Sequence, residues 1–577
     1  MKTLFLYLKR YRKESVLGPL FKLLEAALEL IVPLIVAAII DGGIGTGDRA
    51  YTVRMCLYLV LFGLVGLAFS LTAQYFAAKA AVGCVRDMRG ALFTHISTLS
   101  YSDLDTLGAS TLITRMTSDA RQVQTGVNLT LRLLLRSPFV VFGAMIMAFT
   151  VDAPSALTFT VLIPALSIAV FGIMLLSMPL YRKVQKKLDG VVLSVRENLT
   201  GARVIRAYCK EEEETEAFRQ KHEELTRLEH RVGRLSALLN PLTYVLVNAA
   251  IVWLLHIGAI RVDSGLLTTG QVVALYNYMS QILVELIKLA DLIVTMTRSI
   301  ACAGRIEAIF QTSSSMPMTD GPAPAAIDGA PAIEFSHVSL RYPGAGDDSL
   351  TDVSFSVQPG QVLGIIGGTG SGKSTLVNLI PRLYDATEGT IRIDGHPIDA
   401  WPTQALRRRI GIAMQKAVLF RGSVRDNLAM GDQDATDECM NDALRAAQIK
   451  DIIDEKGGLD APVTQGGTNL SGGQKQRLSV ARAIVRHPDI LILDDSSSAL
   501  DYATDAAMRQ AIRDLPFRPT VCIVSQRAAS LMHADRILVL DEGRLVGQGT
   551  HAELLDTCEV YREIYRSQFE QVGGDAV

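Results

Sequence analysis

Five long stretches without a charged residue constrain the fold of this chain more than any other feature. They are Met55–Ala78, Ser137–Val151, Ala153–Tyr181, Leu235–Ile260 and Ser264–Val284. A helix needs about 20 apolar residues to cross the hydrocarbon core of a bilayer, so four of these stretches qualify directly. The shorter one, Ser137–Val151, qualifies if it extends back through Leu129–Leu135. The sequence therefore predicts a helical membrane domain.

A sixth stretch, Val16–Ile40, is apolar apart from Lys22, Glu25 and Glu29, and it brings the predicted number of crossings to six. Glu25 and Glu29 are four residues apart and share one face of a helix. Charged groups inside a membrane are costly and indicate a pathway or cavity, here a wall that favours cationic cargo. The alternative is a neutralised Lys–Glu cluster near the inner interface, or packing against a neighbouring helix.

Lysine and arginine near the ends of the apolar stretches predict their orientation, because such residues concentrate in cytoplasmic segments. Residues 1–13, MKTLFLYLKRYRK, are basic and amphipathic and are expected to form an elbow helix along the cytoplasmic face of the cell membrane. The connections 79–128 and 182–234 are rich in helix-forming residues. We expect them to continue the membrane helices into the cytoplasm and to reverse around Ser102–Ser110 and Gly201–Glu216, with both termini cytoplasmic.

Charge divides the chain into two parts. Residues 1–310 hold 32 Lys and Arg against 24 Asp and Glu, whereas residues 311–577 hold 25 against 35. A composition that is 49% hydrophobic excludes intrinsic disorder and a nucleic-acid-packaging role, so no nucleic-acid partner is expected. Residues 311–331 are rich in Ser, Pro, Gly and Ala, as linkers are. The predicted organisation is an elbow helix (1–13), a membrane domain (14–310), a linker (311–331) and a soluble domain (332–577).

The soluble part contains a phosphate-binding motif. Val362–Ile366 is predicted to be a buried strand, and Thr375–Leu383 the helix that follows it. Between them the pattern GxxxxGK[ST] is formed by Gly367, Gly368, Thr369, Gly370, Ser371, Gly372, Lys373 and Ser374, with Thr375 next. Glycines let backbone N–H groups surround phosphates, Lys373 adds a positive charge, and the Ser374 hydroxyl can bind Mg²⁺. ATP and Mg²⁺ are the expected cofactors.

A second apolar strand, Ile490–Leu493, ends in Asp494 and Asp495. A carboxylate that leaves such a strand beside a phosphate loop holds Mg²⁺ directly or through water. We assign this role to Asp494, as expected for a nucleoside triphosphatase.

The segment Leu470–Gln474, which reads LSGGQ, leads to a family assignment. Together with the phosphate loop it makes the chain resemble an ABC transporter, specifically an exporter half-transporter whose membrane domain precedes its nucleotide-binding domain. The resemblance implies an all-α six-helix transmembrane domain followed by an α/β P-loop ATP-binding-cassette domain, with the two cytoplasmic reversals acting as coupling segments. It also implies dimers in which each ATP lies between one chain's phosphate loop and the other chain's signature, here Ser471, Gly472, Gly473 and Gln474.

Further positions match the family's motifs one at a time. Tyr342 matches the aromatic residue that stacks on adenine, and Gln415 matches the loop glutamine that links Mg²⁺ to the membrane domain. Asp501 matches the loop that crosses between the two nucleotide-binding domains.

Two positions depart from the family pattern. The family usually has Glu as the general base after the Mg²⁺ carboxylate, and here the residue is Asp495. The switch histidine that contacts the γ-phosphate is replaced by Gln526. A base must lie about 2.6–3.2 Å from its water, and Asp is one methylene shorter than Glu. Losing one catalytic contact typically costs about 10²–10³ in rate, so hydrolysis at this site is expected to be very slow.

The predicted function is ATP-driven export of drugs or other hydrophobic or amphipathic compounds by one half of a heterodimer. This chain resembles the degenerate-site subunit of bacterial heterodimeric multidrug exporters, and its partner would supply Glu and His at the corresponding positions. The alternatives are a slow homodimeric lipid or peptide exporter and a nucleotide-gated regulatory or channel subunit. Fold alone does not select the cargo.

Overall fold

The computed structural model describes residues 2–316 and 321–569. The contacts divide the chain into two compact units. The first unit contains residues 1–96 and 110–312, and the second contains residues 97–109 together with 313–577. The second unit thus includes a short segment from the N-terminal half of the chain. Part of the predicted linker, residues 317–320, lies outside the described residues.

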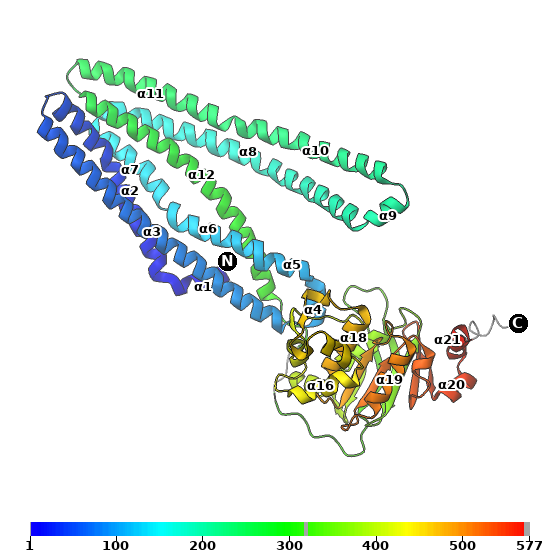
Figure 1. The fold of residues 1–577 in the computed structure, drawn as a ribbon. Coiled ribbons are helices and arrows are strands. Elements are labelled where there is room, and N and C mark those ends of the chain that lie inside the picture. The colour runs from blue at the N-terminus through cyan, green and yellow to red at the C-terminus, as the bar shows by residue number, and fades with distance from the viewer. Residues whose placement is uncertain (1, 317–320, 570–577) are drawn as a thin grey trace. The chain divides into compact units, whose positions relative to one another are not determined.

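The first unit is built from helices, several of them much longer than a bilayer is thick (Figure 1). Its elements are α1 (Lys2–Leu8), η1 (Lys9–Tyr11), α2 (Arg12–Ala38), η2 (Ile39–Ile44), α3 (Arg49–Thr98), α5 (Ala109–Thr114), η3 (Arg115–Asp119), α6 (Ala120–Leu133), α7 (Arg136–Val151), α8 (Ala153–Thr200), α9 (Ala202–Ala207), α10 (Glu211–Ala237), α11 (Leu239–Asp263) and α12 (Thr269–Gln311). The turns between helices that span the apolar stretches are short, as at Asp152, whose carboxylate accepts from the Ser155 N–H and caps α8.

Five helical segments of the described residues are long and apolar enough to cross a membrane: Leu4–Ile44, Arg49–Thr98, Ala109–Val151, Ala153–Thr200 and Glu211–Asp263. The sequence predicted six. The predicted stretch Ser264–Val284 is not among these five; most of it forms the first half of α12, which also carries the polar residues Asn277, Gln281 and Glu285. Glu285 is nevertheless 3% exposed, so this part of α12 is packed inside the unit.

The core of the first unit consists of side chains from α2, α7, α8, α11 and α12. Small residues such as Ala26, Ala144 and Ala274 are fully buried there and allow the helices to approach closely. Tyr278 is also fully buried, and its hydroxyl donates a 2.7 Å hydrogen bond to the carbonyl of Leu30 on α2. Without such a partner the buried hydroxyl would be destabilising.

The two predicted reversals correspond to short helices. The first, α4 (Tyr101–Leu107), lies within Ser102–Ser110 apart from its first residue, and the second, α9 (Ala202–Ala207), follows Gly201. Helix α4 begins with a capping box, in which Ser100 and Asp103 exchange side-chain and backbone hydrogen bonds. It ends at Gly108, whose φ of +75° suits glycine. The sequence thus sets both ends of α4.

The second unit contains two main sheets. The six-stranded sheet has the order β12-β11-β3-β10-β9-β6, parallel except for β12, and the four-stranded antiparallel sheet has the order β2-β1-β4-β5. The strands are β1 (Ile333–Leu340), β2 (Leu350–Val357), β3 (Val362–Gly367), β4 (Glu388–Ile393), β5 (His396–Pro397), β6 (Ile410–Ala413), β7 (Gly422–Ser423), β8 (Pro462–Val463), β9 (Ile490–Asp494), β10 (Thr520–Val524), β11 (Arg536–Asp541) and β12 (Arg544–Gly549).

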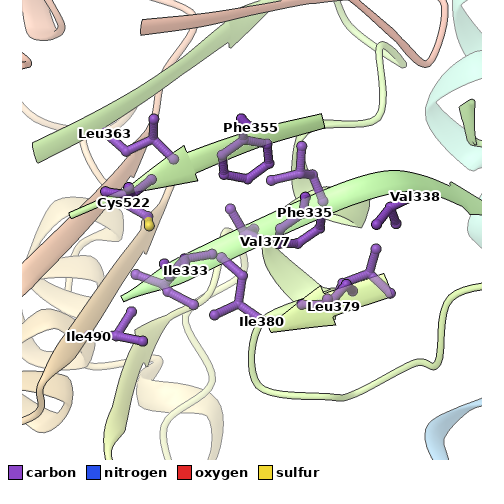
Figure 2. Packing of buried hydrophobic residues seen from close by; sticks show 14 of the residues in the cluster. Ile333, Phe335, Val338, Phe355, Leu363, Val377, Leu379, Ile380, Ile490 and Cys522 are labelled. Carbon is purple, nitrogen blue, oxygen red and sulfur yellow. The ribbon is translucent and has the colours of Figure 1, made fainter. Parts of the chain in front are cut away.

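Helices complete this unit, and they are α13 (Lys373–Leu379), η4 (Ile398–Ala400), α14 (Thr403–Arg408), α15 (Val424–Ala429), α16 (Asp437–Ala446), α17 (Lys450–Glu455), η5 (Gly458–Asp460), η6 (Gln465–Gly467), α18 (Gly472–Ile484), α19 (Tyr502–Arg513), η7 (Ala528–Ser530), α20 (His551–Thr557) and α21 (Glu559–Phe569). The sheets share one core, where Phe335 of β1 stacks on Phe355 of β2 at 4.6 Å between ring centroids (Figure 2). Val377 and Ile380, from α13 and its C-terminal end, pack into the same cluster. This packing fixes the position of the loop between β3 and α13.

Candidate functional site: a nucleotide-binding cavity

The loop between β3 and α13 has a backbone that only glycine accommodates at one key position. Gly372 has a φ of +92°, and a Cβ there would lie 2.7 Å from the carbonyl oxygen of Ser349. The Lys373 ammonium group folds over this loop and donates to the carbonyls of Gly367 (2.9 Å) and Gly368 (2.6 Å). Burial lowers the pKa of Lys373. The loop therefore holds a desolvated positive charge where a phosphate chain would bind.

Asp494, at the end of β9, lies beside the phosphate loop. Its carboxylate accepts a 3.0 Å hydrogen bond from the Ser374 hydroxyl and another from the backbone N–H of Gln415. Burial raises the pKa of Asp494, and the neighbouring Asp495 raises it further. A cation between these oxygens would offset that cost.

A cavity of about 650 Å³ contains most of the predicted site. Its lining comprises Ala345, Asp347, Asp348, Ser349, Thr369, Gly370, Ser371, Gly372, Lys373, Ser374, Thr375, Gln415, Asp494, Asp495, Val524, Gln526, Glu542 and Gly543. The cavity lies at the carboxyl ends of the parallel strands β3, β9 and β10, where α/β sheets bind their ligands.

The two residues that depart from the family pattern, Asp495 and Gln526, both line this cavity. Burial raises the pKa of the Asp495 carboxyl, while Lys373, Arg527 and a hydrogen bond from the Gln415 side chain oppose the rise. The backbone of Asp495 has a φ of +47°, and its N–H donates to the Val524 carbonyl at 3.1 Å. The backbone carbonyl of Gln526 accepts a 2.7 Å hydrogen bond from Gln568 on α21.

Tyr342 lies at the border of the cavity. Its hydroxyl donates a 3.3 Å hydrogen bond to Thr375, and its carbonyl accepts from the N–H of Ala345, which lines the cavity. The ring of Tyr384 meets the Tyr342 ring edge to face, with centroids 5.1 Å apart. The sequence motifs gave no signal for Tyr384, because its role depends on contacts between residues far apart in the chain.

The signature residues are absent from the cavity lining. Ser471 is exposed and caps α18, exchanging hydrogen bonds with Gln474 in a capping box. A Cβ on Gly473 would lie 2.9 Å from the carbonyl oxygen of Ala499, so glycine is required for this packing. Asp501 caps α19 by accepting from the backbone N–H and the hydroxyl of Thr504. The motif is thus an ordered surface, separate from the chain's own phosphate loop.

Asp347, Asp348 and Glu542 line the cavity and were not predicted from the sequence. They follow no motif, and their acidic character alone does not distinguish them from solvated surface residues. Arg527 was also missed. Its guanidinium lies 4.9 Å from the centre of the Tyr502 ring and donates to the Leu500 carbonyl, next to Asp501.

The charged residues of the first unit form a connected network. Lys22 donates to Glu25 at 2.6 Å, and Arg136 of α7 pairs with Glu29 of α2 at 2.5 Å. Arg136 also pairs with Glu285 of α12, which accepts from Ser137 (2.9 Å) and Lys288 (2.8 Å) as well. The side chain of Arg136 is 6% exposed and that of Glu29 is 42% exposed. Both predicted cavity carboxylates therefore have cationic partners, and a role for them in cargo recognition stays a prediction.

Comparison with known proteins agrees with this geometry. Residues 15–286 match the family model of the ABC transporter transmembrane region, and residues 350–498 match that of the ABC transporter. The chain is 36% identical to YfiB, an uncharacterised ABC transporter ATP-binding protein of Bacillus subtilis, with all of both chains covered. It is 33% identical to YheI, a probable multidrug resistance ABC transporter ATP-binding/permease protein of the same organism, covering 98% of this chain and 97% of that one.

Among solved structures, the fold is similar to that of a bacterial Atm1-family ABC exporter with ATP bound, with a TM-score of 0.79 and 23% identity over 97% of this chain and 98% of that one. The resemblance inferred from the LSGGQ segment and the phosphate loop is confirmed. Because its membrane-helical unit, its ATP-binding cavity and its full-length relatives agree, the chain belongs to the ABC transporter family, as a membrane-embedded exporter that carries its own ATPase domain.

Proposed function

We propose that this chain is one half of a heterodimeric ABC exporter and that the ATP site on its own phosphate loop hydrolyses slowly. One observation carries the proposal: Asp495 and Gln526 line the same cavity as Lys373 and Asp494. Both departures from the family pattern therefore affect one ATP site. The signature at Ser471–Gln474 keeps its sequence and its cap, and would complete the partner's site.

The chemistry of the two substitutions explains slow turnover. Asp495 is one methylene shorter than Glu, so its carboxylate reaches less far toward an attacking water. Gln526 can donate a hydrogen bond to a γ-phosphate, but it cannot become cationic as histidine can. ATP bound at Lys373 would then remain for many cycles, while hydrolysis at the partner's site resets the transporter.

The residues around Asp494 suit Mg²⁺. The donors are the Ser374 hydroxyl, the Asp494 carboxylate and the Gln415 side chain, all hard oxygen ligands of the kind that Mg²⁺ prefers together with phosphate oxygens. In the described ranges no three His, Cys, Asp or Glu side chains gather to hold a metal by themselves. When bound, Mg²⁺ would neutralise charge on the phosphates of ATP.

The proposal is tested by restoring the family's residues. The full-length chain is purified alone and assayed for ATPase activity, as the wild type and as Asp495→Glu/Gln526→His. We expect slow wild-type turnover and an increase of about 10²-fold or more in the double variant, since each catalytic contact is worth about 10²–10³. Lys456→Met, an exposed substitution outside the cavity, serves as the control.

Rapid turnover by the wild-type chain as a stable homodimer would overturn the heterodimer proposal. A double variant that dimerises and binds ATP, yet hydrolyses it no faster than the wild type, would overturn the proposal that Asp495 and Gln526 slow this site.

A nucleotide-gated regulator or channel is the second candidate, because a degenerate site also suits a protein that binds ATP for long periods. Transport assays separate the two. Vesicles that contain this chain and its partner should accumulate cargo against its gradient only when ATP is hydrolysed, whereas a channel would let the cargo equilibrate.

The remaining parts of the proposal concern the membrane. We propose six crossings, with the first half of α12 as the sixth, cytoplasmic termini, and domain boundaries at 14–310 and 332–577. The proposed cargo is a hydrophobic or cationic small molecule, in line with the multidrug relative. Unchanged export of cationic dyes by Glu25→Gln and Glu29→Gln would remove the argument for a cationic cargo.

A further inference from the structure

Tyr384 touches two features that lie far apart in the sequence. It lies in the segment between α13 and β4, and its ring meets Tyr342 edge to face, with an angle of 88° between the planes. Its hydroxyl donates a 2.7 Å hydrogen bond to Asp105 on α4. The ring of Tyr101, also on α4, lies 6.4 Å from the Tyr384 ring. All four residues belong to the second unit.

The contact between Tyr384 and Tyr342 connects Tyr384 to the nucleotide-binding cavity. Tyr342 is joined to the end of the phosphate loop by its hydrogen bond to Thr375 and is half-buried at the cavity border. A planar base that enters beside the phosphate loop would find in Tyr342 an aromatic ring on which to stack. Stacking of the base restricts the tilt of the Tyr342 ring. Because Tyr384 meets this ring edge to face, the position of Tyr384 depends on that tilt.

The contacts of Tyr384 with Asp105 and Tyr101 connect it to α4. This helix is joined through the chain to α3 and α5, both of which belong largely to the membrane unit. Asp103, the capping-box partner of Ser100, also accepts from the backbone N–H of Ser315 at 3.0 Å. Asp105 and Tyr101 on α4 both contact Tyr384, so a shift of this tyrosine changes how the helix is held.

The segment that carries Tyr384 is held firmly. Arg407 donates to the carbonyls of Pro381 (3.1 Å) and Arg382 (2.7 Å), and the buried Arg382 side chain pairs with Asp385 at 2.8 Å. Burial raises the pKa of the Tyr384 hydroxyl, as does Asp105, so the hydroxyl is the donor in this pair at neutral pH. Because the backbone around Tyr384 is held in place, a displacement of the Tyr384 ring shifts α4 and is not taken up by movement of the segment.

We propose that Tyr384 is a positioning residue through which α4 responds to a nucleotide base stacked on Tyr342. A ligand that fills the phosphate loop but has no base should bind without altering α4. The inference depends on the base lying against Tyr342 and is independent of how fast this site hydrolyses ATP.

The test measures hydrogen–deuterium exchange at the amides of α4 in the full-length chain in lipid nanodiscs. ATP and inorganic triphosphate are compared at saturating concentrations, and nucleotide affinity is measured separately. In the wild type, ATP should slow exchange in α4 by about threefold or more, because a ligand that favours the ordered state suppresses local opening. Inorganic triphosphate should have no such effect.

Tyr384→Leu and Tyr342→Leu should abolish the difference in α4 exchange between ATP and inorganic triphosphate. Tyr384→Phe and Asp105→Ala each remove the hydrogen bond between Tyr384 and Asp105 and keep the aromatic contact with Tyr342. These two variants should reduce the difference in exchange. Thr106→Ala is the matched control, because within the described residues the Thr106 hydroxyl donates to the Ser102 carbonyl of its own helix and to no other group. If Tyr384→Leu or Tyr342→Leu fails to bind ATP, the exchange measured in Tyr384→Phe and Asp105→Ala decides whether the proposal holds. An equal response to both ligands in the wild type would overturn the proposal, as would a full response to ATP in Tyr384→Phe and Asp105→Ala.

Discussion

The Ser374 hydroxyl donates a 3.0 Å hydrogen bond to Asp494, which lies 120 residues further along the chain. Ser374 is the second residue of α13, the helix after β3, and Asp494 ends β9. In the sheet, β10 lies between these two strands. The order of the parallel strands thus brings the hydroxyl and the carboxylate to one edge, where together they border the nucleotide cavity.

Replacing Asp494 should make the nucleotide-free protein more stable at neutral pH. Because burial raises the pKa of Asp494 above its ordinary value of 3.8, the folded state binds its proton more tightly than the unfolded state does. The stability of the wild type therefore falls as the pH rises from about 4 through the folded-state pKa. Asp494→Asn removes this titration, and each kcal/mol regained raises the apparent Tm by about 2–4 °C.

Thermal unfolding of the full-length chain from pH 4 to 8, without nucleotide, checks this prediction. The gap in Tm between Asp494→Asn and the wild type should widen with pH. The same variant should lose most of its Mg²⁺-dependent ATPase activity. A gap that narrows with rising pH would contradict the sign of the pKa shift.

Lys373→Met should separate folding from nucleotide binding. The Lys373 ammonium is buried, and its partners in the described structure are loop carbonyls and a hydroxyl. The variant should unfold at a Tm close to that of the wild type without ligand. It should gain little Tm on adding ATP, since at a fixed ligand concentration a weaker affinity stabilises the folded state less. Lys456→Met, on the surface, should keep the full ATP-dependent rise.

The two adjacent glycines of the signature should differ in their tolerance of alanine. A Cβ at Gly473 would lie 2.9 Å from the backbone oxygen of Ala499, whereas the nearest described atom to a Cβ at Gly472 is the Ala499 Cβ, at 3.9 Å. Crowding of the first kind costs about 1–3 kcal/mol. We expect urea unfolding to reveal this loss in Gly473→Ala and almost none in Gly472→Ala. Equal stability of the two variants would count against the described packing of α18.

Arg136→Gln should be strongly destabilising, because it leaves the Glu285 carboxylate buried beside fewer cations. Breaking a buried ion pair by removing one partner costs about 3–5 kcal/mol. Glu29→Gln should cost less, because the Glu29 side chain is half-exposed. The apparent Tm in detergent measures both, with the exposed Arg86→Gln as the control. If Arg136→Gln melts like the control, the network has no structural role.

The parts of the site that depend on local chain chemistry could be predicted from the sequence. The phosphate loop is one continuous segment between a strand and a helix, and the predicted residues Thr369–Thr375 all line the cavity. Asp494 and Asp495 were found because they end an apolar strand. The resemblance then supplied Gln415 and Gln526, which the structure brings to the same cavity.

Contacts between distant residues could not be predicted in this way. Asp105 and Tyr384 are 279 residues apart, and nothing in either segment indicates the other. Arg136 lies between the segments Leu129–Leu135 and Ser137–Val151, and it pairs with residues on two other helices. A charge whose partners are 107 and 149 residues away is balanced only by the tertiary fold.

The left-handed backbone at Asp495, with its φ of +47°, has a consequence for the local stability of this site. Asp adopts this conformation more readily than most side chains do, because its short polar group can hydrogen-bond locally. A change from Glu to Asp here would relax the backbone while weakening the base, which is the usual exchange between stability and turnover. Under the proposed function, the same substitution that weakens the base at this position would therefore stabilise the turn that carries it.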